Sequence, residues 1–172
     1  DGSPVLDFFR DRLYQSFRDA GHAHPLVMAA LAAGYDDILD TERRVRALER
    51  IADSDNWRTL VAAVERTANI TRELGEPRQV DPSLATEEEE KRLLEIYNEV
   101  AGPLNELIDQ HDYDAAAAMY CDRFAEPLHV FFEKVFVNVD DESVRTNRLS
   151  LLKRINLLFS ERVADLSEVG KE

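Results

Sequence analysis

The chain contains one Glu-x-x-His spacing, formed by Glu126 and His129. On a helix this spacing places both side chains on one face, and carboxylate-bridged metal centres in helical bundles use it. Such a centre also needs a second Glu-x-x-His pair, and no other histidine in the sequence has a glutamate three residues before it. His22 and His24 lack further ligands at a recognisable spacing. We therefore expect no metal site and no cofactor in this chain.

Side chains for covalent catalysis are equally sparse. Cys121 is the one cysteine, so it cannot form an internal disulfide, and a thiol on a helical segment usually serves packing. The sequence has neither a glycine-rich phosphate loop nor a serine or cysteine nucleophile motif. The residue pattern therefore predicts no enzyme activity for this chain.

Arginine and lysine are the remaining side chains with binding chemistry. The 172 residues include 35 acidic and 21 basic ones, and the net charge of -14 opposes general attraction to nucleic acid. The charges are partly segregated, because acidic runs lie at 87–90 and 140–142 whereas basic clusters lie at 43–50 and 145–154. A local surface could therefore differ in sign from the whole protein.

Helical spacing of apolar residues accounts for almost the whole chain, and no period-two alternation is flanked by turn residues. We expect an all-α fold, a single helical bundle of about seven or eight helices spanning residues 1–172. The segment 76–85 contains two prolines and is the predicted loop. The expected helices are Leu6–Phe17, Leu26–Ala33, Thr41–Ala52, Asn56–Leu74, one beginning at Thr86 and kinked at Pro103, one capped by Asp112, one opened by Pro127, and one from Asp140 or Asp141 to about Val163.

The stretch from Phe131 to Val169 closely resembles the C-terminal end of glycyl-tRNA synthetase β subunits of the bacterial type. Its Arg-x-Asn-Arg-Leu element, at 145–149, also resembles the helical anticodon-binding bundles of DALR type. Shorter matches in the same order extend the resemblance over nearly the whole chain, namely Phe8-Phe9-x-Asp11-Arg12-Leu13, Arg44-x-x-Ala47-Leu48, Arg66-x-x-Asn69-Ile70 and Asp112-Tyr113-x-x-Ala116.

The resemblance implies a DALR-type domain that binds the anticodon region of tRNA(Gly) during glycyl-tRNA synthesis. It implies that catalysis with ATP and glycine belongs to a separate α subunit. The implied partners are tRNA(Gly), that α subunit and the remainder of the β subunit, in the cytoplasm, with no membrane and no DNA. The sequence opens with Asp-Gly-Ser-Pro instead of Met, so we expect a C-terminal piece of a longer polypeptide.

Helical wheels separate core positions from candidate RNA contacts. On the fourth expected helix the apolar arc is centred on Thr67, with Arg66 at its edge and Arg58, Asn69 and Arg72 on the opposite half. These four polar residues are candidates for RNA binding, and a merely solvated face fits the pattern equally well.

On the last expected helix, Arg148 falls in the middle of the apolar arc. We therefore expect a buried, structural arginine, paired with Glu133 or another inward acid. Asn147, Lys153 and Arg154 are predicted to point outward, where they suit phosphate or base contacts.

Arg43, Arg46 and Arg50 form an outward row on the third expected helix, while Arg44 is assigned a structural role. An unpaired row of like charges would indicate an anionic partner. Glu42 and Glu49 lie beside the row, so a surface of ion pairs is an equal alternative. At the level of the whole chain, the alternative to anticodon binding is an acidic helical module that docks on the rest of the synthetase.

Overall fold

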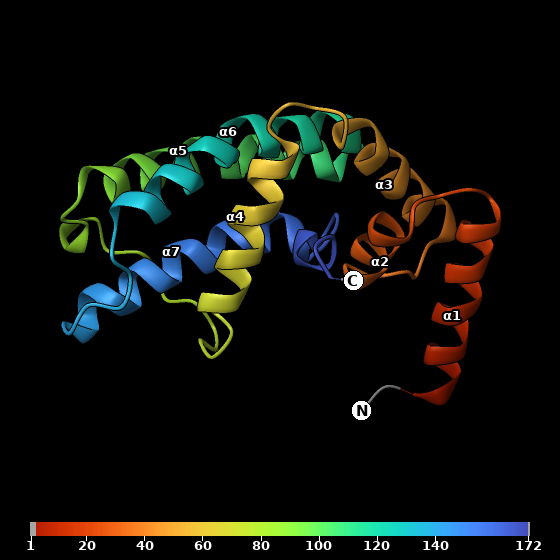
Figure 1. The fold of residues 1–172 in the computed structure, drawn as a ribbon, viewed down its shortest axis with the longest axis horizontal. Helices are drawn as coiled ribbons and strands as arrows, with labels where there is room; N and C mark the ends of the chain where they lie inside the picture. Colours follow the sequence, from red (N-terminus) through yellow and green to blue (C-terminus); the bar gives the residue numbers. More distant parts are fainter. Residues whose placement is uncertain (1–2, 172) are drawn as a thin grey trace.

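The computed structural model describes residues 3–171, which form seven α-helices, two 3-10 turns and no strand (Figure 1). The all-α prediction is confirmed. The elements are α1 (Pro4–Asp19), α2 (His24–Ala32), α3 (Ile38–Ile51), α4 (Trp57–Ile70), η1 (Pro82–Leu84), α5 (Glu88–Asp109), α6 (Tyr113–Lys134), α7 (Glu142–Ser160) and η2 (Leu166–Glu168).

Aspartate caps begin three of the helices. The carboxylates of Asp37, Asp112 and Asp141 accept hydrogen bonds from backbone amides in the first turns of α3, α6 and α7. These bonds satisfy amides that have no partner within the helix. α5 begins one residue later than expected, because Glu87, and not Thr86, is its N-cap and forms a capping box with Glu90.

The two long helices each continue through a proline. The prediction that Pro127 opens a new helix is wrong, because α6 runs unbroken from Tyr113 and Pro127 lies inside it. An internal proline removes a backbone hydrogen bond. A continuous helix, however, keeps Phe124 and Phe131 in the core on both sides of the proline, and neither is accessible to solvent. α5 likewise continues through Pro103.

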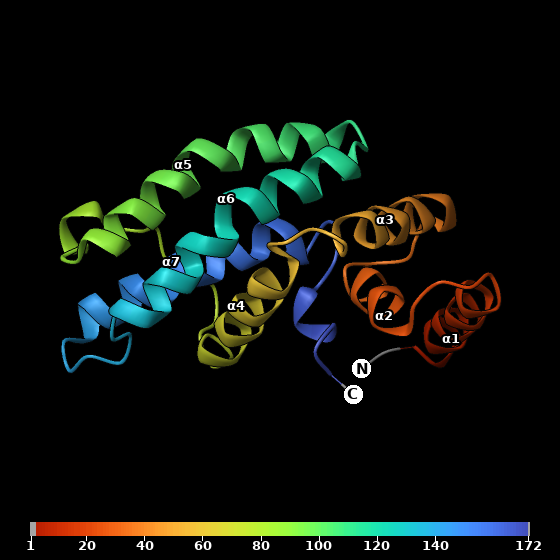
Figure 2. The same cartoon turned by 45° about the horizontal axis from the view of Figure 1, so that its top comes forward.

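The helices form an arch, with α1 and α2 at one end and the far ends of α5, α6 and α7 at the other (Figure 1). α5 and α6 lie side by side as an antiparallel pair, and Figure 2 shows α7 running along them. α4 packs across α6 and α7. One hydrophobic core links these elements, and within it Tyr120 of α6 stacks on Phe159 of α7 with ring centres 4.6 Å apart.

None of the helices in residues 3–171 combines the length and the apolar character that a membrane crossing requires.

Candidate nucleic-acid interface

The outer face of α4 carries the polar residues that the helical wheel assigns to it. Thr67 is buried and donates its hydroxyl proton to the carbonyl of Ala63, whereas Arg58, Arg66 and Asn69 are exposed. Arg72 follows the end of the helix and is exposed as well. The wheel therefore places the core side and the solvent side of α4 correctly.

A groove of about 460 Å³ runs between α4 and α6. Its floor is made of short side chains and one aromatic ring, and its rim is charged. The guanidinium of Arg66 lies over the ring of Phe132, 4.6 Å from the ring centre. The groove is lined by Arg58, Thr59, Ala62, Ala63, Arg66, His129, Phe132 and Glu133.

Two contacts show how α4 lies against α6. Ser54, just before α4, contacts the thiol of Cys121 at 3.7 Å, so α4 begins beside the middle of α6. Three turns later Arg66 reaches Phe132, near the end of α6. The start of α4 therefore lies beside the middle of α6, and Arg66 lies beside the C-terminal part of α6.

The carboxylate of Glu133 lies 3.3 Å from Nε2 of His129, one helical turn before it, and both side chains are about half exposed. One carboxylate oxygen therefore faces the imidazole, and the other oxygen is available to a ligand. Arg58, Arg66 and the imidazole supply hydrogen-bond donors, while Glu133 supplies an acceptor. Proteins hold unpaired RNA bases by stacking them on aromatic rings or arginine guanidinium groups and by hydrogen bonds to the base edges, and this groove offers groups for both kinds of contact.

Asn69 and Arg72 lie outside this groove and form a pair of their own. Arg72 donates from Nη2 to the side-chain oxygen of Asn69 at 2.8 Å. The four α4 candidates are therefore split, since Arg58 and Arg66 line the groove and the Asn69–Arg72 pair lies at the C-terminal end of the helix.

The prediction that Asn147 points outward is wrong. Its side chain is buried, at 7% exposed, because the segment between α4 and α5 folds over this face of α7. The amide group of Asn147 accepts from the backbone N–H of Asp81 at 2.7 Å and donates to the Asp81 carbonyl at 3.0 Å. Asn147 therefore fixes this connecting segment.

Lys153 and Arg154, which were expected to point outward, also contact the connecting segment and are only partly exposed. Lys153 donates from Nζ to the carbonyl of Leu74. Arg154 donates to the carbonyls of Pro77 and Arg78, the latter at 2.8 Å. Both side chains are half-buried, and the bonds that they would offer to phosphates go to backbone carbonyls.

Arg148 lies in the core, where the wheel places it. Arg148 is 4% exposed and donates from Nε to the Glu90 carboxylate at 2.8 Å, and from Nη1 to the carbonyl of Phe136 at 2.7 Å. Glu133, the acid first considered as its partner, is exposed at the groove between α4 and α6. Glu90 takes its place because the first turn of α5 packs against α7.

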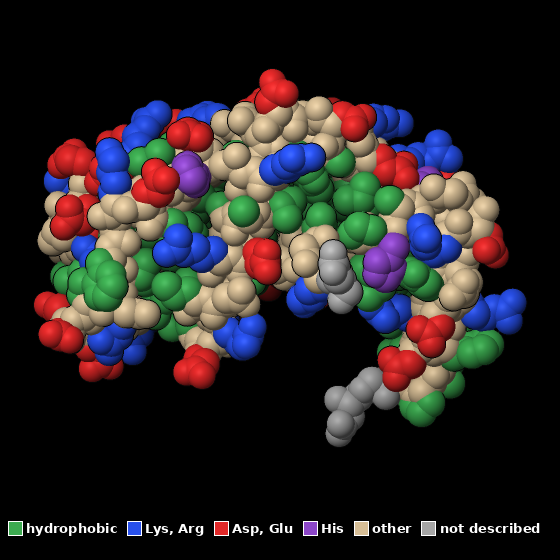
Figure 3. All heavy atoms as spheres, viewed as in Figure 1, with side chains coloured by type: hydrophobic (Ala, Val, Ile, Leu, Met, Phe, Trp, Pro, Cys, Tyr) green, Lys and Arg blue, Asp and Glu red, His purple; other side chains and the backbone are tan. Residues whose placement is uncertain are grey.

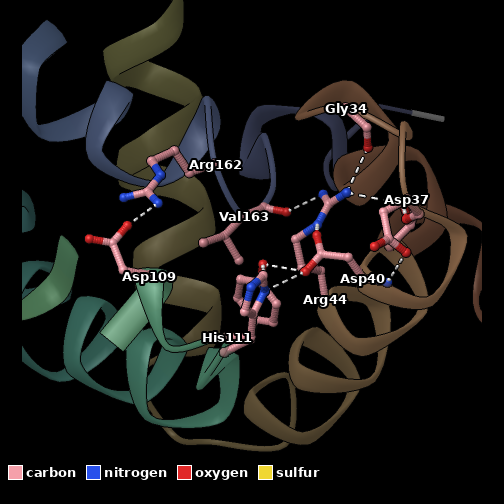
Figure 4. A network of polar contacts seen from close by, with 10 residues as sticks. Gly34, Asp37, Asp40, Arg44, Asp109, His111, Arg162 and Val163 are labelled. Atoms are coloured by element: carbon pink, nitrogen blue, oxygen red, sulfur yellow. Dashed lines mark hydrogen bonds and ion pairs between the residues drawn. The ribbon is translucent and has the colours of Figure 1, made fainter. Parts of the chain in front are cut away.

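Arg44 is buried and joins α3 to two other parts of the chain (Figure 4). Its guanidinium donates to the carbonyls of Ala30 and Gly34 around the end of α2, and to that of Val163 after α7. Its Nε donates to the Asp40 carboxylate at 3.1 Å. Five donors in a fixed plane allow one arginine to satisfy several carbonyls at once.

Asp40 accepts two further hydrogen bonds at this junction, from the hydroxyl of Tyr113 at 2.5 Å and from Nδ1 of His111 at 2.9 Å (Figure 4). Burial by itself would raise the pKa of Asp40, but the bonds from Tyr113, His111 and Arg44 outweigh it and hold that pKa below its ordinary value. Burial and the nearby carboxylate raise the pKa of Tyr113.

The arginine row of α3 is exposed but largely paired. Arg46 contacts Glu42 and Arg50 contacts Asp114, each with a shortest distance of 2.7 Å. Glu49, the other acid beside the row, contacts His22 instead. The row therefore has the character of a surface with ion pairs.

Charges of both signs alternate over the face shown in Figure 3. The candidate cations do not border a single groove, since Arg58 and Arg66 line the one between α4 and α6 whereas Arg154 lines another beside Tyr97. Within residues 3–171, no group of three or more His, Cys, Asp or Glu side chains is placed to hold a metal ion.

Three groove residues, His129, Phe132 and Glu133, were not among the expected RNA contacts. Their spacing of three and four residues puts them on one face of α6, and that signal could have been read. It does not reveal that α4 crosses this face and brings Arg66 onto Phe132, because the crossing depends on packing between distant segments.

Comparison with known proteins agrees with this architecture. The chain is 34% identical over 168 residues to the glycine–tRNA ligase beta subunit of Syntrophus aciditrophicus, covering 98% of this chain and 24% of that protein. It is 37% identical over 169 residues to the beta subunit of Trichlorobacter lovleyi, covering 96% and 24%. It is 36% identical over 165 residues to that of Aeromonas hydrophila, covering 95% and 24%. The chain thus spans about a quarter of the length of the curated relatives that it matches.

The family described as the DALR anticodon binding domain matches residues 60–164. This range begins in α4, contains all of α5, α6 and α7, and includes Arg66 and the α6 side of the groove. Because the match covers well over half of an all-helical chain, the chain belongs to the DALR anticodon binding domain family.

Proposed function

We propose that this chain is the tRNA-binding module of a glycine–tRNA ligase β subunit and recognises the anticodon region of tRNA(Gly) during glycyl-tRNA synthesis. The membership in an anticodon-binding family and the names of the relatives support the proposal. The observation that carries it is the groove between α4 and α6, which combines two exposed arginines with an aromatic ring inside the matched region or at its edge.

The chemistry of the groove suits a single-stranded loop better than a duplex. An unpaired base can stack against the Arg66 guanidinium and offer its edge to polar groups of the rim. With a net charge of -14, the chain as a whole attracts phosphates poorly at long range, so affinity must come from local contacts. We therefore expect weak binding by this chain alone.

In the longer protein, the remaining partners follow from the same proposal. The rest of the β subunit and an α subunit supply most of the tRNA affinity, and the adenylation of glycine with ATP takes place on the α subunit. The present chain then needs neither a catalytic residue nor a cofactor, and it works in the cytoplasm, where aminoacylation for translation occurs.

A protein-docking role is the second candidate, and one observation favours it. Six large apolar side chains are more than half exposed on the first half of α1 and the start of α3, which is unusual for a surface that faces only water. The helices α1 and α3, which carry these side chains, lie at the opposite end of the arch from the start of α7 (Figure 1). The six side chains, called the apolar patch below, are Val5, Leu6, Phe8, Phe9, Ile38 and Leu39.

Titration of the chain with the anticodon stem-loop of a glycine tRNA, and with the same stem carrying a scrambled loop, tests the first proposal. We expect tighter binding of the native loop at moderate salt. Equal binding of both loops would remove anticodon recognition, and a steep salt dependence alone would show only phosphate contacts.

Exchanging Phe8 and Phe9 for serine should leave this titration unchanged and weaken assembly with the other subunits if the apolar patch is a docking surface.

A further inference from the structure

The face with which α1 packs on α2 continues beyond α2. Leu6, Phe9, Leu13 and Phe17 recur at spacings of three and four residues, so they lie on one face of the helix. Leu13 and Phe17 are buried, at 8% and 5% exposed, and α1 packs mainly on α2. Leu6 and Phe9 belong to the same face but are 53% and 55% exposed. Within residues 3–171, the first half of α1 therefore presents a packing face without a partner.

The rest of the apolar patch widens this face. Val5 and Phe8 adjoin it on α1 and are also more than half exposed. The hydroxyl of Tyr35 donates to the carbonyl of Leu6 at 3.4 Å, so the segment that leads to the exposed start of α3 lies beside the first half of α1. Hydrophobic side chains lie along this free end of α1 in Figure 3. Soluble monomeric proteins rarely leave a large apolar patch open to water, so the patch indicates a partner surface.

The size of the patch indicates what kind of partner covers it. An interface between independent proteins takes roughly 20–30 residues from each side, whereas the apolar patch has six. A separate subunit or a second copy of the chain would gain too little from this contact to remain bound. A segment of the same polypeptide is held nearby by its linker at a high effective concentration, so that a small contact is sufficient.

Charge argues against a nucleic acid or a lipid surface as the partner. Binding to phosphates or to anionic headgroups requires an excess of basic residues. The charges of α1 are balanced, because three aspartates are matched by three arginines, namely Asp7, Asp11, Asp19, Arg10, Arg12 and Arg18. A neutral helix with an apolar face fits an apolar protein surface.

The beta subunits that this chain resembles are long enough to provide that surface. The matched region is 24% of the length of each of the three relatives, so about three quarters of each protein lies outside it. We propose that the apolar patch docks on an apolar surface elsewhere in the same β polypeptide, and thereby fixes the direction in which the groove between α4 and α6 faces.

This inference narrows the docking role to a partner within one chain. It rests on the proposed function only in placing the present chain within a longer β subunit. The docking surface and the groove are separate, since no residue of the apolar patch lines the groove. Loss of docking can therefore be measured without loss of the RNA site.

Hydrogen exchange in the full-length β subunit, without the α subunit, tests the inference. In the wild type, amides in the first half of α1 should exchange at least about tenfold more slowly than in the double variant Phe8→Gln, Phe9→Gln, because docking protects this part of the helix. Glutamine removes the apolar area and still favours a helix. The double variant should also speed exchange in a second segment of the β subunit, and that segment is the docking partner.

Phe136→Gln is the matched control. Phe136 is also an exposed phenylalanine, at 73%, and it lies between α6 and α7 at the other end of the arch (Figure 1). Its replacement should leave exchange in α1 at the wild-type rate. Circular dichroism should give the same helix content for all three proteins, and each should bind the anticodon stem-loop equally well, because none of the replaced side chains lines the groove.

Three results would overturn the inference. Protection of α1 that appears only after the α subunit is added would identify a separate subunit as the partner. Protection that rises with the concentration of the β subunit would identify a second copy. Equal exchange of α1 in the wild type and the double variant would show that the patch docks on nothing. Each of these results leaves anticodon recognition intact, whereas equal binding of native and scrambled loops would overturn anticodon recognition and leave the docking contact in place.

Discussion

The guanidinium of Arg148 on α7 and the carboxylate of Glu90 on α5 form an ion pair in which Nε donates to the carboxylate at 2.8 Å, and these residues are 4% and 1% exposed. Glu90 also receives the backbone N–H of Glu87 as part of the capping box of α5. The pair therefore joins the start of one helix to the middle of another. Each buried charge is compensated by its partner.

Replacing Arg148 with alanine should destabilise the domain by about 3–5 kcal/mol, because Glu90 would remain as an uncompensated buried charge. Urea denaturation followed by far-UV circular dichroism measures this loss. The double variant Arg148→Met with Glu90→Leu should recover most of it, since a buried ion pair is often replaceable by apolar residues of similar size. A loss below about 1 kcal/mol in the single variant would contradict the role assigned to Arg148.

Asn147→Ala should loosen the segment between α4 and α5, because the two hydrogen bonds to the backbone of Asp81 disappear. We expect a loss of about 1–3 kcal/mol, in line with buried polar groups left without partners. Hydrogen exchange at the Asp81 amide is the specific measurement, and it should accelerate more than exchange in the middle of α6. Unchanged exchange at Asp81 together with weaker RNA binding would restore Asn147 as a contact residue.

Adjacent residues on α7 show how far the sequence determines the site. The apolar period places Arg148 inside, because burial against other helices follows the 3.6-residue repeat. The burial of Asn147 cannot be predicted from the apolar repeat. It arises because residues 74–81 cross the face of α7 that carries Asn147. A polar side chain that forms hydrogen bonds to the backbone of a connecting segment falls on the polar side of a helical wheel, and so it is predicted to face solvent. Three of the expected RNA contacts, Asn147, Lys153 and Arg154, were assigned to solvent on that ground.

Helix boundaries show the same limit. The cap Asp112 is identifiable from the sequence, and the cap of the last helix is narrowed to Asp140 or Asp141, because a side chain that bonds its own first turn is a local feature. Pro127 was expected to begin a helix on equally local grounds. It lies inside α6 because both flanking turns are anchored in the core by residues distant in sequence. Local chemistry therefore predicts the elements, and tertiary packing determines their continuity and their crossings.

Asp40 should make the stability depend on pH in the acid range. The folded state lowers the pKa of Asp40, so the unfolded chain takes up this proton at higher pH, near the ordinary value of about 4. The stabilisation is fully present above that pH and is lost as the pH falls through the lower folded-state pKa. Asp40→Asn should therefore be less stable than the wild type at pH 7, and the difference should shrink toward pH 3.

Denaturation midpoints measured from pH 7 to pH 3 for both proteins provide this comparison. Asp114→Asn is the control, because Asp114 is an exposed acid that pairs with Arg50 at the surface and should contribute little. A difference between the wild type and Asp40→Asn that stays constant over the whole range would show that the carboxylate contributes through geometry and not through its charge.

The pair of Asn69 and Arg72 at the end of α4 gives the last prediction. Arg72 is exposed and donates one hydrogen bond to the Asn69 side chain, so its other N–H groups are available to a phosphate. Arg72→Ala should weaken binding of every loop by a similar factor and reduce the slope of log affinity against log salt by about 1. Titrations of native and scrambled stem-loops at several salt concentrations measure both effects.

Asn69→Ala separates the two roles that its amide could have. Because the Asn69 oxygen accepts from Arg72, the amide nitrogen remains free to donate to a base edge. If it reads a base, discrimination between loops should fall more than total affinity does. Lower thermal stability with unchanged discrimination would instead make Asn69 a structural residue. An Asn69→Ala variant could instead behave like Arg72→Ala, with a flatter slope of log affinity against log salt and intact discrimination between loops. That result would show that Asn69 acts only by holding Arg72 in place.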